Sequence, residues 1–245
     1  MSVVLVTGGS RGIGAAIALA CAELGHDVAV NYARDAAAAQ QIAGRIESLG
    51  RRALTIQADV ADEAQVLTMF ERVDAMQGPL VGLVNNAGIV VPSAPLEAQD
   101  MARWQRVFAV NVFGTLACCR EAAQRMSTKR GGAGGSIINL SSRAAVVGSG
   151  GIYVDYAATK GAIDTLTLGL AKELISEGIR VNGVRPGVID TEIHADSGLD
   201  PQSALAGIPI GRLGRAEEIA EAVRWLLSPA ASYCVGTIID VAGGR

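Results

Sequence analysis

The chain has 245 residues, of which 50% are hydrophobic and 18% charged, and its net charge is −3. This apolar content excludes disorder over most of the chain, and the length favours one domain over residues 1–245. No basic stripe suited to nucleic acid occurs, and no apolar run reaches the ~20 residues that cross a bilayer.

Short apolar runs alternate along the chain with longer stretches that have the period of a helix. The runs lack polar alternation, which is typical of strands buried on both faces of a parallel sheet. We therefore predict a doubly wound α/β fold, a seven-stranded parallel sheet with helices on both faces. The predicted strands are Val3–Val6, Val28–Tyr32, Ala53–Gln57, Leu80–Val84, Ser136–Leu140, Arg180–Val184 and Thr237–Val241. The predicted helices are Ile13–Leu24, Ala36–Leu49, Glu63–Met76, Met101–Met126, Tyr156–Glu177 and Ala216–Leu227.

The amino-terminal residues lack the basic region and cleavage site of a signal peptide and lead directly into a predicted strand. The cysteines form no Cys-x-x-Cys pair, so we expect small buried residues in a cytoplasmic protein without a metal site. They are Cys21, Cys118, Cys119 and Cys234.

Two segments between the predicted elements are rich in glycine. Residues 131–135 predict a flexible turn between a helix and a strand. Residues 191–214 form a long, irregular stretch with Gly, Pro, Asp and Ser, and such stretches are often binding loops. We expect this second segment to be the substrate loop.

The first predicted strand leads into Thr7-Gly8-Gly9-Ser10-Arg11-Gly12-Ile13-Gly14 and then into a helix. Glycines allow a tight turn close to a pyrophosphate, and a helix N-terminus offers free N–H groups and a positive dipole end. The order of strand, glycine turn and helix therefore predicts dinucleotide binding, although a simple tight turn has the same appearance.

The spacing Thr-Gly-x-x-x-Gly-Ile-Gly resembles the cofactor turn of the short-chain dehydrogenase/reductase family, and further motifs follow in that family's order over essentially the whole chain. They are Asp59-Val60, Asn85-Asn86-Ala87-Gly88, Asn111-Val112, Tyr156-x-x-x-Lys160 and Arg185-Pro186-Gly187. The resemblance implies a Rossmann fold and hydride transfer between a nicotinamide cofactor and a carbonyl or secondary alcohol. The pattern is similar to both the 3-oxoacyl-carrier-protein reductases and the glucose 1-dehydrogenase-like members.

The resemblance also implies a set of cofactor-binding residues. They are Gly8, Ser10, Arg11, Gly12, Ile13, Gly14, Asn31, Tyr32, Arg34, Asp59, Val60, Asn86, Ala87, Gly88, Tyr156, Lys160, Pro186, Gly187, Ile189 and Thr191. The backbone of Ile189 and the hydroxyl of Thr191 are expected to orient the carboxamide. Asp59 has a second interpretation as a helix cap.

The end of the second predicted strand bears on the choice between NADP and NAD. Relatives that prefer NAD usually carry an Asp there, whereas this chain has Tyr32 and no carboxylate before Asp35. Arg11 and Arg34 are suitable partners for a 2′-phosphate, although each alone is also an ordinary surface charge. We predict NADP as the preferred cofactor, with NAD as the alternative.

Tyr156 and Lys160 stand four residues apart and share one face of a helix. A phenol has a pKa of about 10, and a neighbouring ammonium lowers the pKa. By resemblance, Tyr156 is the general acid/base, and Lys160 lowers its pKa and holds the nicotinamide ribose. Tyr153 lacks such a partner, because Ala157 stands four residues on.

Ser142 is expected to hydrogen-bond the reacting oxygen, with Ser141 as the alternative because Ser142 lies one residue further from Tyr156 than in many relatives. Asn111 is expected to anchor a water in a proton relay to Lys160, unless it is an ordinary helix residue. Substrate specificity is expected from Val90–Leu96, Arg143–Val154 and Glu192–Gly211.

Several side chains near the predicted site have two interpretations. His194 and Asp196 either touch substrate or are solvated. A group of cations either receives an acidic carrier protein or forms a solvated surface. They are Arg103, Arg106, Arg125, Lys129 and Arg130.

The expected partner is a small carbonyl or alcohol substrate, with no nucleic acid and no membrane. Met101–Met126 and Tyr156–Glu177 are expected to pair with their copies, and Ile238–Gly244 to form a second interface, in a homotetramer or homodimer. A second class of function is a sensor or scaffold that binds NADP without chemistry.

Overall fold

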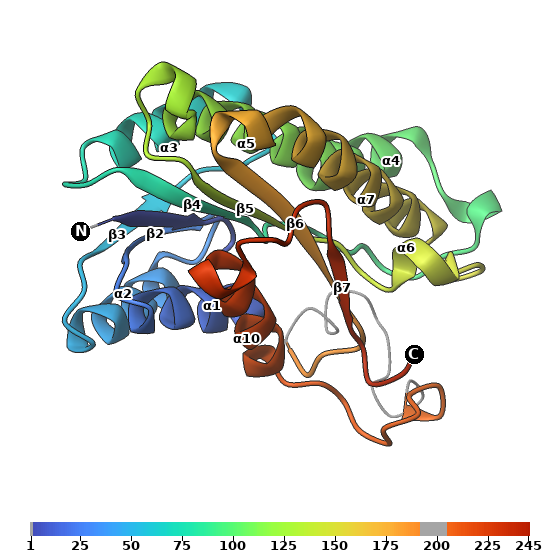
Figure 1. Ribbon diagram of the computed structural model, residues 1–245. Helices are drawn as coiled ribbons and strands as arrows, with labels where there is room; N and C mark the ends of the chain where they lie inside the picture. Colours follow the sequence, from blue (N-terminus) through green and yellow to red (C-terminus); the bar gives the residue numbers. More distant parts are fainter. Residues whose placement is uncertain (1, 192–204) are drawn as a thin grey trace.

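The computed structural model describes residues 2–191 and 205–245, and a parallel sheet of seven strands forms its centre (Figure 1). The order of the strands is β3-β2-β1-β4-β5-β6-β7, and every pair is parallel. The strands are β1 (Val3–Val6), β2 (Asp27–Tyr32), β3 (Ala53–Gln57), β4 (Leu80–Asn85), β5 (Gly135–Leu140), β6 (Ile179–Pro186) and β7 (Ile238–Val241). The predicted doubly wound Rossmann fold is confirmed.

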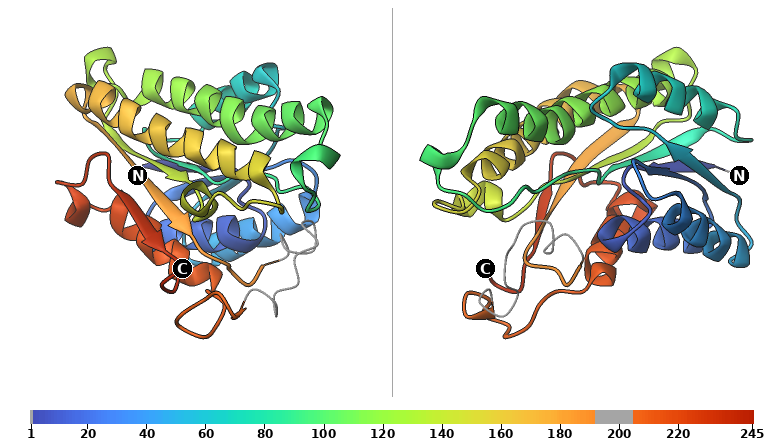
Figure 2. Two further views of the ribbon diagram at one scale, coloured as in Figure 1. Left: turned by 90° about the vertical axis from the view of Figure 1, so that its right-hand side faces the viewer. Right: turned by 180° about the vertical axis from the view of Figure 1, so that it is seen from behind.

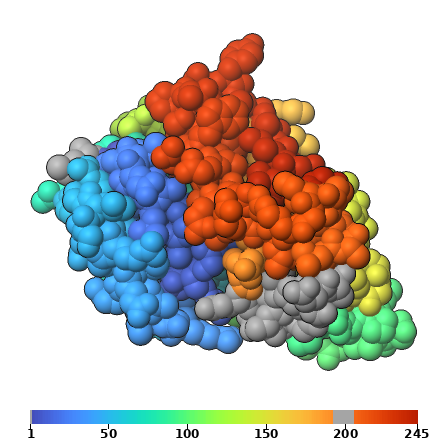
Figure 3. Space-filling model, turned by 90° about the horizontal axis from the view of Figure 1, so that it is seen from below, coloured from blue at the N-terminus to red at the C-terminus, as the bar shows by residue number. Residues whose placement is uncertain are grey.

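Helices cover both faces of this sheet. One face carries α1 (Gly12–Glu23), α2 (Ala36–Ser48) and α10 (Ala216–Leu227). The other carries α3 (Glu63–Asp74), α4 (Met101–Phe108), α5 (Gly114–Met126) and α7 (Val154–Leu174) (Figure 2). Because α1 packs against α10, the amino-terminal and carboxy-terminal parts of the chain lie side by side on the lower face in Figure 3.

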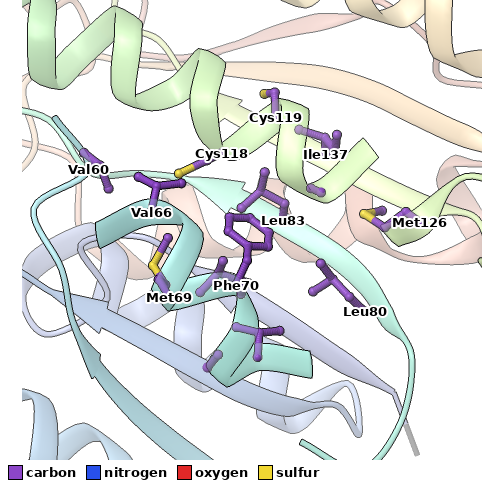
Figure 4. Close-up of a cluster of buried hydrophobic side chains, with 14 of the residues drawn as sticks. Val60, Val66, Met69, Phe70, Leu80, Leu83, Cys118, Cys119, Met126 and Ile137 are labelled. Atoms are coloured by element: carbon purple, nitrogen blue, oxygen red, sulfur yellow. The ribbon is translucent and has the colours of Figure 1, made fainter. Parts of the chain in front are cut away.

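Apolar side chains fill the space between the sheet and each helix layer. Phe70 of α3 is fully buried and packs with Leu83 of β4 and Cys118 of α5 (Figure 4). Below the sheet, Ile17 of α1 and Ile219 of α10 belong to a second buried cluster. The fully buried β-branched strands explain why the sequence predicts these elements well.

The long helix predicted over Met101–Met126 is not a regular α-helix throughout. Its turn Ala109–Phe113 is a π-helix that separates α4 from α5. The helix predicted over Tyr156–Glu177 begins two residues earlier, at Val154, and its last turn, Ile175–Glu177, is a 3-10 helix. A short helix, α6 (Ala144–Val147), was not predicted, because four residues are too few to show a period.

The carboxyl ends of the strands place the expected functional segments along one edge of the sheet. The glycine turn follows β1, the Asn86–Gly88 segment follows β4, and Ser141 and Ser142 follow β5. Pro186 ends β6, the next strand along. In the described ranges, no helix has both the length and the apolar character needed to cross a membrane.

Candidate active site

The glycine turn brings the backbone into a conformation that other residues rarely adopt. Gly8 has φ of 60° and Gly12 has φ of 52°. A Cβ on Gly14 would lie 2.2 Å from the carbonyl oxygen of Gly8, so the start of α1 rests directly on the turn. The side chain of Arg11, at the N-cap, makes no capping hydrogen bond. The amides at the start of α1 are therefore not capped by Arg11, as an anion site requires.

Two asparagine side chains hold the glycine turn from behind. Asn31 accepts a hydrogen bond from the Gly8 amide at 3.1 Å, and Asn86 donates to the carbonyls of Thr7 and Gly8 at 3.0 Å. Asn31 is 1% exposed, and its amide also donates to the carbonyls of Ile56 and Ala58. The side chain of Asn31 therefore supports the glycine turn from within the sheet.

The segment after β2 carries an exposed arginine, and its one carboxylate, Asp35, is already hydrogen-bonded. Arg34 is exposed, and the Asp35 carboxylate caps α2 by accepting from the Ala38 amide at 2.9 Å. Arg11 is exposed in the glycine turn. Exposed arginines thus lie after β2 and in the glycine turn, while the carboxylate of Asp35 is engaged at the start of α2.

The acidic residue after β3 also has a defined role. Asp59 accepts from the Ala61 amide at 3.0 Å and pairs with Arg106 at 2.9 Å. The N-cap of α3 is Asp62, so the alternative interpretation of Asp59 as that helix's cap is wrong. Val60 is buried against Gly114, where a Cβ would lie 2.7 Å from its side chain.

One cavity of about 140 Å³ brings the expected catalytic side chains together. Ser142, Tyr156 and Lys160 line it, and the Lys160 nitrogen lies 5.6 Å from the centre of the Tyr156 ring. Expected cofactor residues share the lining. They are Ile13, Asn86, Gly88, Pro186, Gly187, Ile189 and Thr191.

Burial shifts the pKa values of the Tyr156–Lys160 pair in opposite senses. It raises the pKa of Tyr156 to about 12, against a side-chain hydrogen bond with Ser142 that lowers it. Burial lowers the pKa of Lys160 to about 8, although the nearby charge of Asp164 acts to raise it. Lys160 donates to the Leu140 carbonyl at 2.7 Å, which fixes its ammonium group beside the tyrosine. Both groups are thereby moved away from their ordinary titration ranges, as is common at active sites.

The two adjacent serines have different environments. Ser141 is buried and its hydroxyl donates to the main-chain carbonyl of Lys160 at 3.2 Å. Ser142 is half-buried, lines the cavity, and accepts from the Ala144 amide at 3.1 Å. The short helix α6 follows Ser142, and the second serine reaches the cavity.

Asn111 lies in the π turn beside the cavity. Its amide accepts from the Ile89 amide at 2.8 Å and donates to the Ile89 carbonyl and to Thr159. A Cβ on Gly88 would lie 3.3 Å from the Asn111 oxygen and 3.7 Å from the Lys160 nitrogen. Asn111 and Lys160 therefore border the same small space, and π turns are frequent at functional sites.

Some lining residues were not expected and some expected ones were not located. Arg245 lines the cavity, and no sequence pattern indicates this, because its position depends on how the chain returns after β7. Tyr153, which belongs to the expected specificity segment Arg143–Val154, also lines the cavity, and its ring packs edge-on against that of Tyr156 with 5.6 Å between the ring centres. His194 and Asp196 lie outside the described residues.

The cations considered as a carrier-protein surface are mostly paired. Arg103 binds Asp155 at 2.7 Å, and Arg125 binds Asp74 at 2.8 Å. Arg106 is held by Asp59, and Lys129 donates to Ser176 at 3.0 Å. An acidic partner would have to compete with these acceptors.

Comparison with known proteins gives matches over nearly the whole chain. A family model described as enoyl-(acyl carrier protein) reductase matches residues 8–245. The uncharacterized oxidoreductase YgfF of Escherichia coli (strain K12) is 52% identical, over 100% of each chain. The cis-4-hydroxycyclohexanecarboxylate dehydrogenase of Sinomonas cyclohexanicum is 41% identical over 99% of this chain and 95% of that protein.

Among solved structures, a short chain dehydrogenase from Burkholderia cenocepacia J2315 in complex with NADP has a TM-score of 0.90 and 36% identity. The similarity covers 98% of this chain and 96% of that one.

Proposed function

The chain belongs to the short-chain dehydrogenase/reductase family, and from this premise we propose a reversible, NADP(H)-dependent oxidation of a secondary alcohol to a carbonyl on a small substrate. The chain is thus an oxidoreductase whose chemistry is hydride transfer. The observation that carries the assignment of the site is that Ser142, Tyr156 and Lys160 line one cavity beside the segment after β6.

The geometry of the glycine turn fits a dinucleotide. The uncapped start of α1 offers amides to the pyrophosphate, and Gly12 faces Thr191, whose methyl carbon would lie 3.4 Å from a Cβ there. A side chain at Gly12 would therefore fill the space between the turn and the segment expected at the nicotinamide. When bound, the nicotinamide accepts or supplies the hydride.

The protein's own residues handle the proton and the substrate oxygen. Tyr156 takes the proton from the alcohol during oxidation and returns it to the carbonyl oxygen during reduction. Ser142 donates a hydrogen bond to that oxygen as it gains negative charge. The Lys160 ammonium favours the phenolate form of Tyr156 by its charge.

The proposed activity is tested with a panel of ketones, aldehydes and secondary alcohols, followed by NADPH absorbance. We expect turnover with at least one small member. NADPH binding without turnover anywhere in the panel would instead support a sensor or scaffold. The relative named for a hydroxycyclohexanecarboxylate supports including ring alcohols.

The two serines provide a matched pair of variants. Ser142→Ala is expected to lower kcat about 10²–10³-fold, because it removes a donor to the reacting oxygen. Ser141→Ala removes only the hydrogen bond to the Lys160 carbonyl, so we expect less than about a tenfold fall. Steady-state rates at saturating NADPH measure both. The reverse order would assign the role to Ser141.

The cofactor preference is tested at Arg11 and Arg34. Replacing both by Ala is expected to lower kcat/KM for NADP about 10–100-fold while changing the value for NAD less than about threefold, because only NADP carries the 2′-phosphate. Arg45→Ala is the control, since Arg45 is an exposed arginine of α2. A wild-type preference for NAD, or equal losses with both cofactors, would contradict the assignment.

We also propose that the protein is a cytoplasmic homotetramer, with a homodimer as the smaller alternative. Phe113, Leu116 and Leu168 are 60%, 42% and 46% exposed on the outer helix layer. Gly161 and Gly169 on α7 have open space where a Cβ would stand, which permits close approach of another helix. The four cysteines are free thiols. A monomeric mass in dilute solution would contradict the assembly.

A further inference from the structure

The active-site cavity has an unequal distribution of charge. Its described lining contains Arg143, Lys160 and Arg245 and no Asp or Glu side chain. Lys160 is already engaged beside Tyr156, where it donates to the Leu140 carbonyl. The two arginines have no part in the proposed proton transfer, so their presence in the lining calls for another explanation.

Arg143, directly after Ser142, is only partly satisfied by hydrogen bonds. Its Nη1 donates to Asp240 at 2.7 Å, whereas its Nε is buried and has no acceptor among the described residues. Asp240 also forms an ion pair with Arg185 at 3.4 Å, and Arg185 forms a second ion pair with Asp164 at 2.9 Å. Because two carboxylates are divided between two guanidinium groups, donors of Arg143 remain for a further acceptor.

Arg245 reaches the same cavity from the chain that follows β7. That chain is fixed, because Gly187 donates to the Val241 carbonyl and Ile210 to the Gly243 carbonyl, both at 3.0 Å. The residue is half-buried, yet its guanidinium makes no hydrogen bond or ion pair with any described residue. The described residues therefore leave the guanidinium donors of Arg245 unused.

Part of the remaining lining is apolar. Val90 and Val147 contribute aliphatic side chains and Tyr153 an aromatic ring. A ligand that contacts both the arginines and the apolar side chains has a short apolar body and one anionic group. A carboxylate suits the arginines, since its two oxygens lie in one plane and accept two parallel N–H bonds.

We propose that Arg143 and Arg245 form a carboxylate-binding subsite, and that the substrates are therefore oxo acids and the corresponding hydroxy acids. This inference rests on the proposed oxidoreductase function of the same cavity. The carboxylate pairs with the arginines while the carbonyl at the other end of the apolar body meets Ser142 and Tyr156. The subsite thus selects both the substrate and its direction in the cavity.

The test compares oxo acids with their uncharged amides, which have nearly the same shape. Suitable pairs are levulinate with levulinamide and an oxocyclohexanecarboxylate with its carboxamide. Each is assayed for NADPH oxidation and, by calorimetry, for binding to the protein saturated with NADP. The variants are Arg143→Gln, Arg245→Gln and Arg143→Lys, with Arg224→Gln as control, since Arg224 of α10 pairs with Glu221 at 3.1 Å and is absent from the cavity lining.

We expect wild type to prefer the acid in at least one pair by about 10–100-fold in kcat/KM, through KM. Arg143→Gln and Arg245→Gln should each remove most of that preference. The kcat/KM for the amide should stay within about twofold of the wild-type value. Arg143→Lys should retain part of the preference for the acid, and Arg224→Gln should retain all of it. An equal fall in kcat/KM for both acid and amide would show that the arginines have a structural role, and it would overturn the subsite.

The binding measurement separates the two proposals. Turnover of neutral ketones with no preference for acids overturns the subsite and leaves the oxidoreductase function intact. If no panel member is turned over, binding of the acid that is lost in both glutamine variants supports the subsite although the proposed activity fails. Equal binding of acid and amide, or none of either, overturns the subsite.

Discussion

Replacing Tyr156 by Phe is expected to lower kcat at least about 10³-fold in both directions, because the substrate oxygen then loses its proton donor and acceptor. The ring itself remains in place, edge-on to Tyr153, so the cavity keeps its shape. The affinity for NADPH, measured by fluorescence titration, should change by less than about threefold. The loss should therefore appear in kcat at saturating cofactor.

The matched control for this variant is Tyr233→Phe. Tyr233 is fully exposed and lies outside the described cavity lining, so loss of its hydroxyl should leave the rate unchanged. Near-full activity of a folded Tyr156→Phe protein that binds NADPH would show that another group transfers the proton. Because Ser142 hydrogen-bonds Tyr156, it would then be the next group to examine.

The same tyrosine predicts opposite pH dependences in the two directions. Oxidation needs the phenolate, so its kcat/KM should rise about tenfold per pH unit below the pKa of Tyr156 in the complex. Reduction needs the phenol, so its kcat/KM should be constant with pH below that pKa and fall above it. Burial, opposed by the hydrogen bond with Ser142, raises the pKa of Tyr156 to about 12 in the protein without cofactor. A midpoint well below this value would measure the effect of the Lys160 ammonium and the cationic nicotinamide.

The elements that the sequence predicts best are those whose pattern reflects burial. Val3–Val6 and Ala53–Gln57 match β1 and β3 at both ends, since an apolar run bounded by turn residues defines a strand in a covered sheet. The motifs also follow from the sequence, because the carboxyl ends of parallel strands meet at one edge.

Other features depend on contacts that no local pattern contains. Asn31 resembles a residue that faces the cofactor, but its amide is used by the Gly8 amide and by two carbonyls of the neighbouring chain. The π turn at Asn111 interrupts a stretch whose sequence has the period of one continuous helix. Arg245 reaches the cavity only because the chain after β7 turns back over the segment after β6.

Replacing Gly14 by Ala is expected to raise the Kd for NADPH about 100-fold and to destabilise the fold by about 1–3 kcal/mol. The new Cβ would lie 2.2 Å from the carbonyl oxygen of Gly8 in the turn and 2.5 Å from the side-chain amide nitrogen of Asn86, which hydrogen-bonds the turn. Either the turn or the first residues of α1 must shift, and we propose that both supply amides to the pyrophosphate. Fluorescence titration and thermal unfolding measure the two effects.

Intrinsic helix propensity predicts the opposite sign at this position, since Ala stabilises a helix interior by about 0.5–1 kcal/mol relative to Gly. Gly44→Ala in α2 isolates that contribution, because no atom lies within 4 Å of its new Cβ. We expect Gly44→Ala to raise Tm by about 1–4 °C with unchanged NADPH binding, and Gly14→Ala to lower both stability and binding. If Gly14→Ala behaved like Gly44→Ala, close contact between α1 and the turn would not be needed for cofactor binding. The anion would then be held chiefly by side chains such as Arg11 and Arg34, and the double arginine variant should abolish binding of both cofactors.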